Sequence, residues 1–151
     1  MHMSHSIQYF ILDEFKLIIE VFSGPIFLKD LIDLKQRQLE DSRFNSDYNS
    51  ISDLCDAKMN LPINDIKTYI EHYSKMSSLH GNRKCAILTS SPKAAAIAMV
   101  YRNYSSGFAM SYEVFTTVKA TLRWIDIAES EFEVISRHLS SQREEVRLLA
   151  S

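Results

Sequence analysis

Apolar residues alternate with other residues near the start of the chain, over residues 9–11 and again over residues 15–21. This period of two is typical of strands with one buried face, and it places Lys16 and Glu20 on the polar side. The Asp-Glu pair at residues 13–14 separates the two runs and predicts a tight turn. The pattern therefore predicts an antiparallel hairpin at the start of the fold.

Beyond the hairpin, apolar residues recur at steps of three and four, the spacing of amphipathic helices. This spacing predicts helices over residues 27–40, 63–73, 92–104 and 117–125. In the first of them it predicts burial of Phe27, Leu28, Leu31, Ile32 and Leu39. Ser91 and Pro92 are typical of an N-cap and a first helical position. Apolar runs between the helices predict strands over residues 50–56, 84–89 and 108–115.

The end of the chain has a different pattern, in which apolar positions form a narrow stripe. The stripe consists of Ala128, Phe132, Ile135, Leu139, Gln142, Val146 and Leu149, spaced alternately by four and three residues. Such a heptad seam predicts one more helix that packs against another surface. Packing on the chain's own domain is the first interpretation, and a homodimer contact through Phe132, Ile135, Leu139, Val146 and Leu149 is the alternative.

The chain has 151 residues, of which 46% are hydrophobic, and a formal net charge of -2. These values are typical of one soluble globular domain. Its basic residues are scattered, which argues against nucleic acid or a membrane surface as a partner. We expect a disordered segment over residues 1–6, an α/β domain over 7–126, a helical extension over 127–151, and a cytoplasmic location.

The order of predicted elements, strand, strand, helix, strand, helix, strand, helix, strand, helix, resembles the STAS-like superfamily, which includes bacterial anti-sigma-factor antagonists. The similar stretches are LIIEVFSGPIFLKDLIDLKQ, DYNSISDLCDAK, RKCAILTSSPKAAAIA and YEVFTTVKATLRWI. The resemblance covers about residues 8 to 126. It implies a mixed five-stranded sheet with strands in nearly sequential order, helices mainly on one face, and a binding or regulatory role.

In the antagonists of this superfamily, a serine at the start of the second helix is phosphorylated to switch partner binding. The corresponding stretch here, residues 56–62, reads DAKMNLP and has no hydroxyl residue. The phosphorylation switch therefore does not transfer to this chain.

Polar residues follow several predicted strands and would meet at one edge of a parallel sheet. They are Ser23, Asp56, Lys58, Thr89, Ser90, Ser91, Lys93, Thr116 and Thr117. Free N–H groups at helix starts, with the two lysines nearby, could hold a phosphate or carboxylate. Helix capping explains the same hydroxyl residues without any ligand.

Other residues with reactive side chains have plain structural interpretations. Cys55 lies in a predicted strand next to Leu54, which favours a buried apolar role over a nucleophilic one. His72, His80 and His138 are expected on the surface, and no metal or cofactor site is expected. Asp53 and Asp56, three residues apart in an extended segment, are expected on opposite faces and not as an acid/base pair.

The aromatic residues offer one candidate surface. Tyr101, Arg102 and Tyr104, at the end of the third helix, are expected to form an exposed patch, and Tyr and Arg are frequent at protein interfaces. Our first hypothesis is thus a non-catalytic regulatory or protein-interaction module that binds a protein partner or itself. The alternative is a carrier or sensor of a small apolar, lipid-like or anionic ligand, which would need a cavity between helices and sheet. An enzyme that uses the strand-end hydroxyls is the least favoured.

Overall fold

The chain is described by a computed structural model that covers residues 4–151. Its strands are β1 (Ser6–Leu12), β2 (Leu17–Ile26), β3 (Asn49–Met59), β4 (Lys84–Leu88) and β5 (Ser111–Phe115). Its α-helices are α1 (Leu28–Glu40), α2 (Ile63–Ser74), α3 (Pro92–Tyr104), α4 (Val118–Trp124) and α5 (Phe132–Ala150). Short 3-10 turns occur at Asp13–Phe15, Ser77–Leu79 and Glu129–Glu131. This element order confirms the predicted α/β fold.

The strands form a single mixed sheet in the order β1-β2-β3-β4-β5. β1 pairs with β2 in antiparallel fashion, and the other neighbours are parallel. The predicted hairpin is thus confirmed, with Lys16 in the left-handed region at φ 49° where the turn ends. Because the parallel strands run together, the ends of β2, β3, β4 and β5 lie at one edge of the sheet, as predicted.

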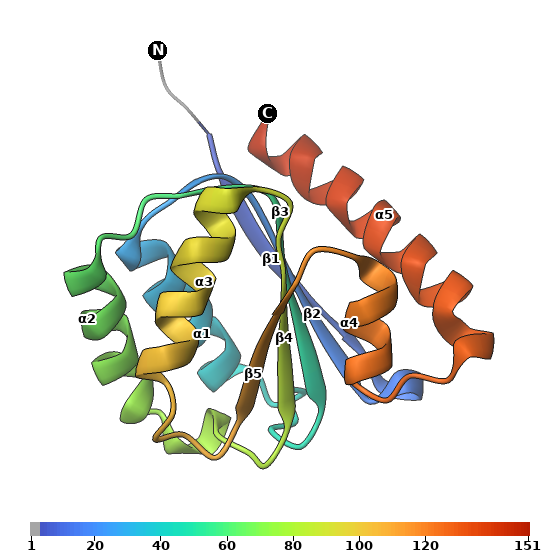
Figure 1. Cartoon of the computed structure of the whole chain (residues 1–151), viewed down its shortest axis with the longest axis horizontal. Helices are drawn as coiled ribbons and strands as arrows, with labels where there is room; N and C mark the ends of the chain where they lie inside the picture. The colour runs from blue at the N-terminus through green and yellow to red at the C-terminus, as the bar shows by residue number, and fades with distance from the viewer. Residues whose placement is uncertain (1–3) are drawn as a thin grey trace.

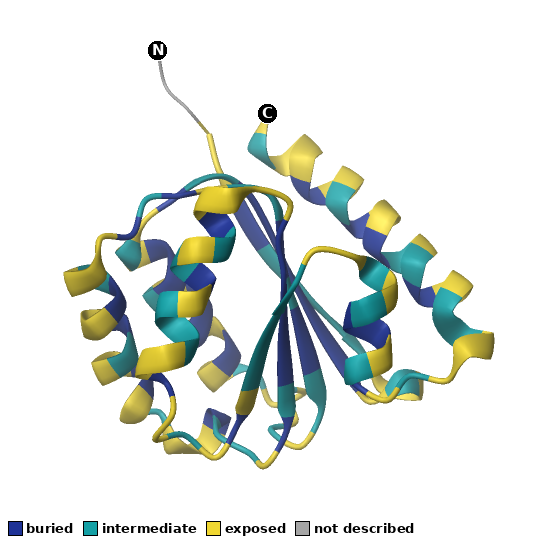
Figure 2. Cartoon of the chain, viewed as in Figure 1, coloured by how far each residue is buried: buried dark blue, intermediate teal, exposed yellow. Residues whose placement is uncertain are grey.

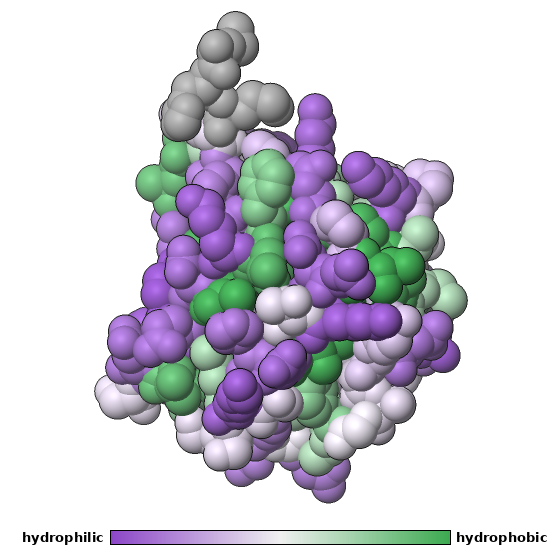
Figure 3. All heavy atoms as spheres, turned by 90° about the vertical axis from the view of Figure 1, so that its left-hand side faces the viewer, coloured by the Kyte–Doolittle hydropathy of each residue, from purple (hydrophilic) through white to green (hydrophobic). Residues whose placement is uncertain are grey.

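Helices cover both faces of the sheet: α1, α2 and α3 lie on one side, and α4 and α5 on the other (Figure 1). The prediction of helices mainly on one face is therefore wrong. β4 shows why both faces need helices. Cys85 and Ile87 face one side of the sheet and Ala86 and Leu88 face the other, and all four are buried. A parallel strand that is apolar on both faces must be covered on both. Figure 2 shows buried strands between helices whose outer faces are exposed. On the side of the molecule where α2 lies, hydrophilic residues cover much of the surface, with apolar residues between them (Figure 3).

The buried face of α1 differs from the predicted one. Leu31 is buried as predicted and Leu28 and Ile32 are half-buried, but Phe27 is 47% exposed and Leu39 is 39% exposed. Leu34, Lys35 and Gln38 are buried instead. The face of α1 that packs on the sheet includes two polar residues, Lys35 and Gln38, because both donate hydrogen bonds to Glu20 of β2. Glu20 itself is only 6% exposed, although the alternation placed it on the polar side of its strand.

A β-bulge in β3 changes which way its acidic residues point. Val21 pairs with Asp53, but Ser23 pairs with Asp56, so β3 advances by three residues where β2 advances by two. The extra residue reverses the alternation. Asp53 and Asp56 therefore both bind arginines of α5, and the expectation of opposite faces is wrong.

The tail forms α5, which packs on β1 and β2 of its own chain. Ile135, Leu139 and Val146 are no more than 1% exposed. These members of the predicted dimer contact are covered by the sheet and are not accessible to a second copy. Phe132 is half-buried, and Leu149 is exposed.

The prediction of a disordered segment over residues 1–6 is wrong at Ser6. Residues 1–3 lie outside the described residues, and Ser6 already belongs to β1. His5 Nε2 lies 3.0 Å from Oδ1 of the buried Asp30. Within residues 4–151, no helix is both long and apolar enough to cross a membrane.

Candidate functional site

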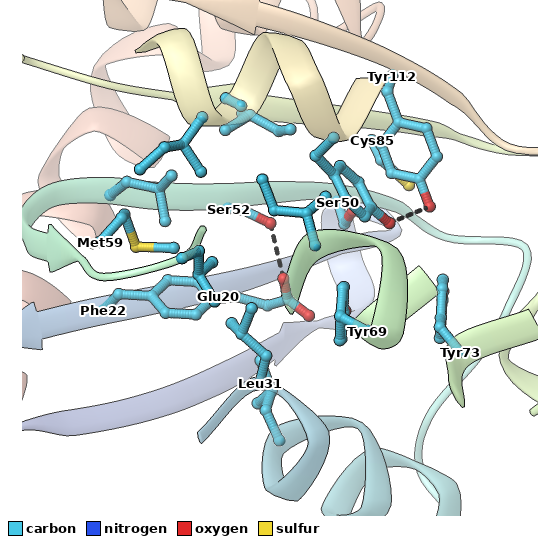
Figure 4. A pocket seen from close by; sticks show the side chains of 18 of the residues that line it. Glu20, Phe22, Leu31, Ser50, Ser52, Met59, Tyr69, Tyr73, Cys85 and Tyr112 are labelled. Atoms are coloured by element: carbon cyan, nitrogen blue, oxygen red, sulfur yellow. Dashed lines mark hydrogen bonds between the residues drawn. The ribbon is translucent and has the colours of Figure 1, made fainter. Parts of the chain in front are cut away.

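A cavity lies between the sheet and the layer formed by α1, α2 and α3, with a volume of about 90 Å³ (Figure 4). Its wall is mainly apolar and comes from strands and helices alike. The apolar lining residues are Phe22, Leu31, Leu34, Leu54, Met59, Leu61, Ile66, Ile87, Ile97 and Ala98. A cavity of this composition with a few polar groups has the character of a small-molecule site.

Small side chains leave this space open. Ser50 and Ser52 point from β3 into the cavity, and Cys85 does so from the neighbouring β4. Ala98 faces them from α3. Because these residues are shorter than the Leu and Ile elsewhere in the core, the helices and the sheet do not fill the interior completely.

A buried polar network occupies one wall of the cavity. Glu20 accepts hydrogen bonds from Lys35 Nζ at 2.8 Å, from Gln38 Nε2 at 2.6 Å and from Ser52 Oγ at 2.7 Å. Lys35 also donates to Gln38 Oε1 at 3.1 Å. Ser52 lies directly opposite Glu20 in the register of β2 and β3. Figure 4 shows the Glu20 carboxylate directed toward Ser52.

The network keeps both charges in place despite their burial. Burial raises the pKa of Glu20, but the Lys35 ammonium and the hydrogen bonds outweigh burial and lower it to about 2. Burial lowers the pKa of Lys35, but the Glu20 carboxylate outweighs it and raises the pKa above its ordinary value. Glu20 is therefore a charged acceptor that three donors already engage, and not a free general base.

Tyrosines form another part of the wall, and one of them lies beside the polar network, because Lys35 Nζ is 5.1 Å from the centroid of the Tyr73 ring. The rings of Tyr69 and Tyr73 stack with centroids 6.0 Å apart, and Tyr101 Oη donates to Tyr112 Oη at 3.0 Å (Figure 4). Burial raises the pKa of Tyr69, Tyr101 and Tyr112 well above the ordinary value for a phenol. These hydroxyls stay protonated at neutral pH and serve as neutral hydrogen-bonding groups.

Arg83 completes the polar lining. It precedes β4 and is only 6% exposed. Its guanidinium donates to Tyr73 Oη and to the carbonyl oxygens of Tyr48 and Leu79, each at 3.4 Å. Its Nε has no hydrogen-bond partner. The side chain lies 5.6 Å from the centroid of the Phe44 ring.

No family model and no curated protein matches this sequence. A similar solved structure is that of an uncharacterised protein of the DUF3478 family with a SpoIIAA-like fold, from Shewanella loihica PV-4. The two chains are 10% identical, with a TM-score of 0.53 over 83% of this chain and 96% of that one. This chain has a SpoIIAA-like fold. The STAS-like resemblance is thereby confirmed at the level of the fold, and an identity of 10% shows nothing beyond it.

In this SpoIIAA-like fold, the polar residues predicted at the strand ends mostly serve the backbone. Ser91 Oγ accepts from Ala94 N and caps α3, and Thr117 Oγ1 accepts from Ala120 N and caps α4. Ser90 Oγ donates to the Cys55 carbonyl, and Thr89 Oγ1 donates to the Phe115 carbonyl. Ser91 and Thr117 therefore have the helix-capping role that explains such hydroxyls without a ligand.

The other residues of the predicted strand-end site differ in their surroundings. Asp56 is paired with Arg147, and Ser23 is buried opposite Asp56. Lys58, Lys93 and Thr116 are exposed. Anion binding at this edge stays a prediction. The stretch DAKMNLP, which the resemblance aligned with a phosphorylated loop, begins inside β3.

The predicted aromatic patch is not a continuous surface. Tyr101 points inward and lines the cavity, so its assignment to an exposed patch is wrong. The reason is the phase of α3, which turns Tyr101 toward Tyr112 of the sheet and Tyr104 outward. Arg102 forms an ion pair with Glu113 at 2.8 Å. Tyr104 is 47% exposed.

Several cysteine and histidine side chains differ from expectation: Cys55, His80 and His138 are half-buried, whereas His72 is exposed as expected. Burial is the main reason that the pKa of Cys55 is raised, to about 11, with Asp53 adding to it. His80 is half-buried and not a surface residue: its Nε2 lies 2.7 Å from the Tyr73 carbonyl oxygen, and its ring packs on Tyr73 and Phe108. Residues 4–151 contain no group of three or more His, Cys, Asp or Glu placed to hold a metal ion.

Sequence reasoning missed the residues that make the cavity polar, namely Glu20, Lys35, Gln38, Ser52 and Arg83. One signal was present: Ser50 and Ser52 occupy alternate positions of a strand whose neighbours Ile51 and Leu54 are apolar. Small polar residues on a central strand indicate either space or a polar partner opposite. The burial of Glu20 had no local signal, because it depends on α1 folding over β2.

Proposed function

We propose that this chain is a non-catalytic binding module that takes up a small, mainly apolar molecule in the cavity beneath α1, α2 and α3. The observation that supports the proposal is the cavity of about 90 Å³, lined by apolar side chains and by a few convergent polar groups. Ligand sites in proteins have this composition. The absence of a catalytic role is part of the proposal, supported by the raised pKa of Cys55 and by the three hydrogen bonds that the Glu20 carboxylate already accepts.

The size of the cavity limits the ligand. An engineered apolar cavity of roughly 150 Å³ accepts benzene, and this one is smaller. A molecule of about five non-hydrogen atoms is therefore a suitable probe. Propionamide has that size, a short apolar part and a neutral polar end.

A filled cavity tests the proposal. Ala98 is 3% exposed and lines the cavity, and Ala98→Leu places added methyl groups inside it. Ala96 lies on the exposed face of the same helix, so Ala96→Leu is the matched control. We expect propionamide, titrated by NMR, to bind the wild type and Ala96→Leu equally, and Ala98→Leu at least tenfold more weakly.

Two results would contradict the proposal. One is that the wild type binds neither propionamide nor propionate, the carboxylate of the same shape. The other is equal binding by the two leucine variants, because the probe would then occupy a different place. Circular dichroism of both variants controls for folding, since overpacking a core costs about 1–3 kcal/mol.

Protein association is the second candidate function. Leu148 and Leu149, near the end of α5, are 67% and 59% exposed and offer an apolar contact to a partner. Native mass spectrometry of the full chain measures the oligomeric state, and Leu149→Glu should convert a homodimer to monomer. A wild-type monomer that co-purifies with no other protein would contradict this candidate.

A further inference from the structure

The strongest unexplained feature of the cavity is the charge of Arg83. A guanidinium carries five N–H donors and stays protonated in proteins. Here it is 94% removed from solvent, since 6% of its surface is exposed. Its three hydrogen bonds go to neutral oxygens and are all 3.4 Å long, and Nε makes none.

No carboxylate among residues 4–151 forms an ion pair with this group, although the charge of Glu20 acts on it through space. None of the ion pairs among residues 4–151 includes Arg83. Glu20 is the acidic residue in the cavity wall, and its oxygens already accept from Lys35, Gln38 and Ser52. The cavity wall contains two positive residues, Lys35 and Arg83, and one negative residue, Glu20, so it carries one positive charge in excess.

An unpaired charge inside a protein is costly, because it has lost its hydration without gaining a partner. The neighbouring groups do not remove that cost. Tyr69, Tyr101 and Tyr112 keep their protons at neutral pH and cannot act as counter-ions. The Phe44 ring offers only a cation–π contact at 5.6 Å.

We infer that the cavity selects a small monocarboxylate, whose anionic group binds the guanidinium of Arg83 while its short apolar part lies among the aliphatic side chains. This inference rests on the proposed function and names the chemical class of its ligand. A carboxylate matches the guanidinium geometry through two parallel hydrogen bonds. One carboxylate neutralises the excess positive charge, and the volume of about 90 Å³ restricts the chain attached to it.

The test compares two probes of the same shape on the full-length wild type near neutral pH. Propionate carries the carboxylate, and propionamide replaces it with a neutral amide. We expect propionate to bind at least tenfold more tightly in NMR titrations. Equal or weaker binding of propionate, with propionamide still bound, overturns the carboxylate inference and leaves the proposed function standing. Binding of neither probe contradicts both.

Substitutions test whether Arg83 causes the preference for propionate over propionamide. Arg83→Gln should lower propionate affinity to that of propionamide and leave propionamide affinity unchanged. Arg83→Lys retains the charge but not the forked geometry, and should recover only part of the preference. Arg102→Gln, which removes a surface arginine paired with Glu113, is the matched control and should change neither affinity. A preference for propionate that survives Arg83→Gln overturns the assignment, and the wild-type comparison decides the inference if that variant does not fold.

Discussion

Nε of Arg143 in α5 lies 2.5 Å from Oδ2 of Asp53, which is 90 positions earlier in β3. The Asp53 side chain is 1% exposed, and its other oxygen accepts from Cys55 N at 3.0 Å. Further along α5, Arg147 binds Asp56 through both of its carboxylate oxygens. These two pairs fix the position of the last helix along the bulged strand.

Breaking the first pair should destabilise the fold. Arg143→Gln leaves the buried Asp53 carboxylate without its cation, and loss of one partner of a buried pair costs about 3 kcal/mol. Urea unfolding measures the change. Arg137→Gln, on the exposed side of α5 with Glu133 as its partner, is the control and should change stability by less than about 0.5 kcal/mol. Equal effects of the two variants would show that the Asp53 pair does not hold α5 in place.

The Glu20 network should make stability depend on pH. Its pKa falls from 4.5 to about 2 on folding, so the folded state holds this proton less tightly than the unfolded state. The network's stabilisation is therefore complete above about pH 4.5 and declines as the pH falls toward 2. Each unit of pKa shift corresponds to about 1.4 kcal/mol.

The measurement is urea unfolding of the wild type and Glu20→Gln at several pH values. The wild type should be the more stable near neutral pH, and the difference should shrink as the solution is acidified below about pH 4.5. Subtracting the two curves removes the contribution of other carboxyl groups. A difference that stays constant with pH would contradict the role assigned to Glu20.

The heptad stripe of α5 should act within one chain. Leu139 is 1% exposed against the sheet, so Leu139→Ala should lower the free energy of unfolding by about 2–5 kcal/mol. Leu148 on the same helix is 67% exposed, and Leu148→Ala should cost less than about 0.5 kcal/mol. If Leu139→Ala left stability unchanged but altered the oligomeric mass, the stripe would belong to a dimer contact.

Cys55 should be a slow nucleophile. Burial, with Asp53 nearby, raises the pKa of its thiol from 9.0 to about 11, which lowers its thiolate fraction about 100-fold. Iodoacetamide should therefore label the native protein far more slowly than the urea-unfolded protein, as followed by intact mass. Cys85 is buried and should also be protected. Rapid labelling of native Cys55 would mean that this thiol is more exposed and more acidic than the structure indicates.

Much of the fold could be predicted because its signals are local. The alternation over residues 15–21 predicted β2, and Ser91 with Pro92 predicted the start of α3, because cap and propensity effects depend on neighbouring residues. The cavity could not be predicted in this way. Glu20, Lys35 and Arg83 come from segments far apart in the sequence, and a charged residue on a strand is interpreted locally as solvent-facing.

The sequence by itself determined the order of strands and helices and the first residues of α2, β4 and α3, because backbone preferences and hydrophobic period act over a few residues. The tertiary structure alone decided that helices cover both faces, that the bulge turns Asp53 and Asp56 toward α5, and that Tyr101 and Arg83 line an interior space. The physical reason is that burial and charge pairing depend on which segments pack together, and that depends on contacts between residues distant in the chain.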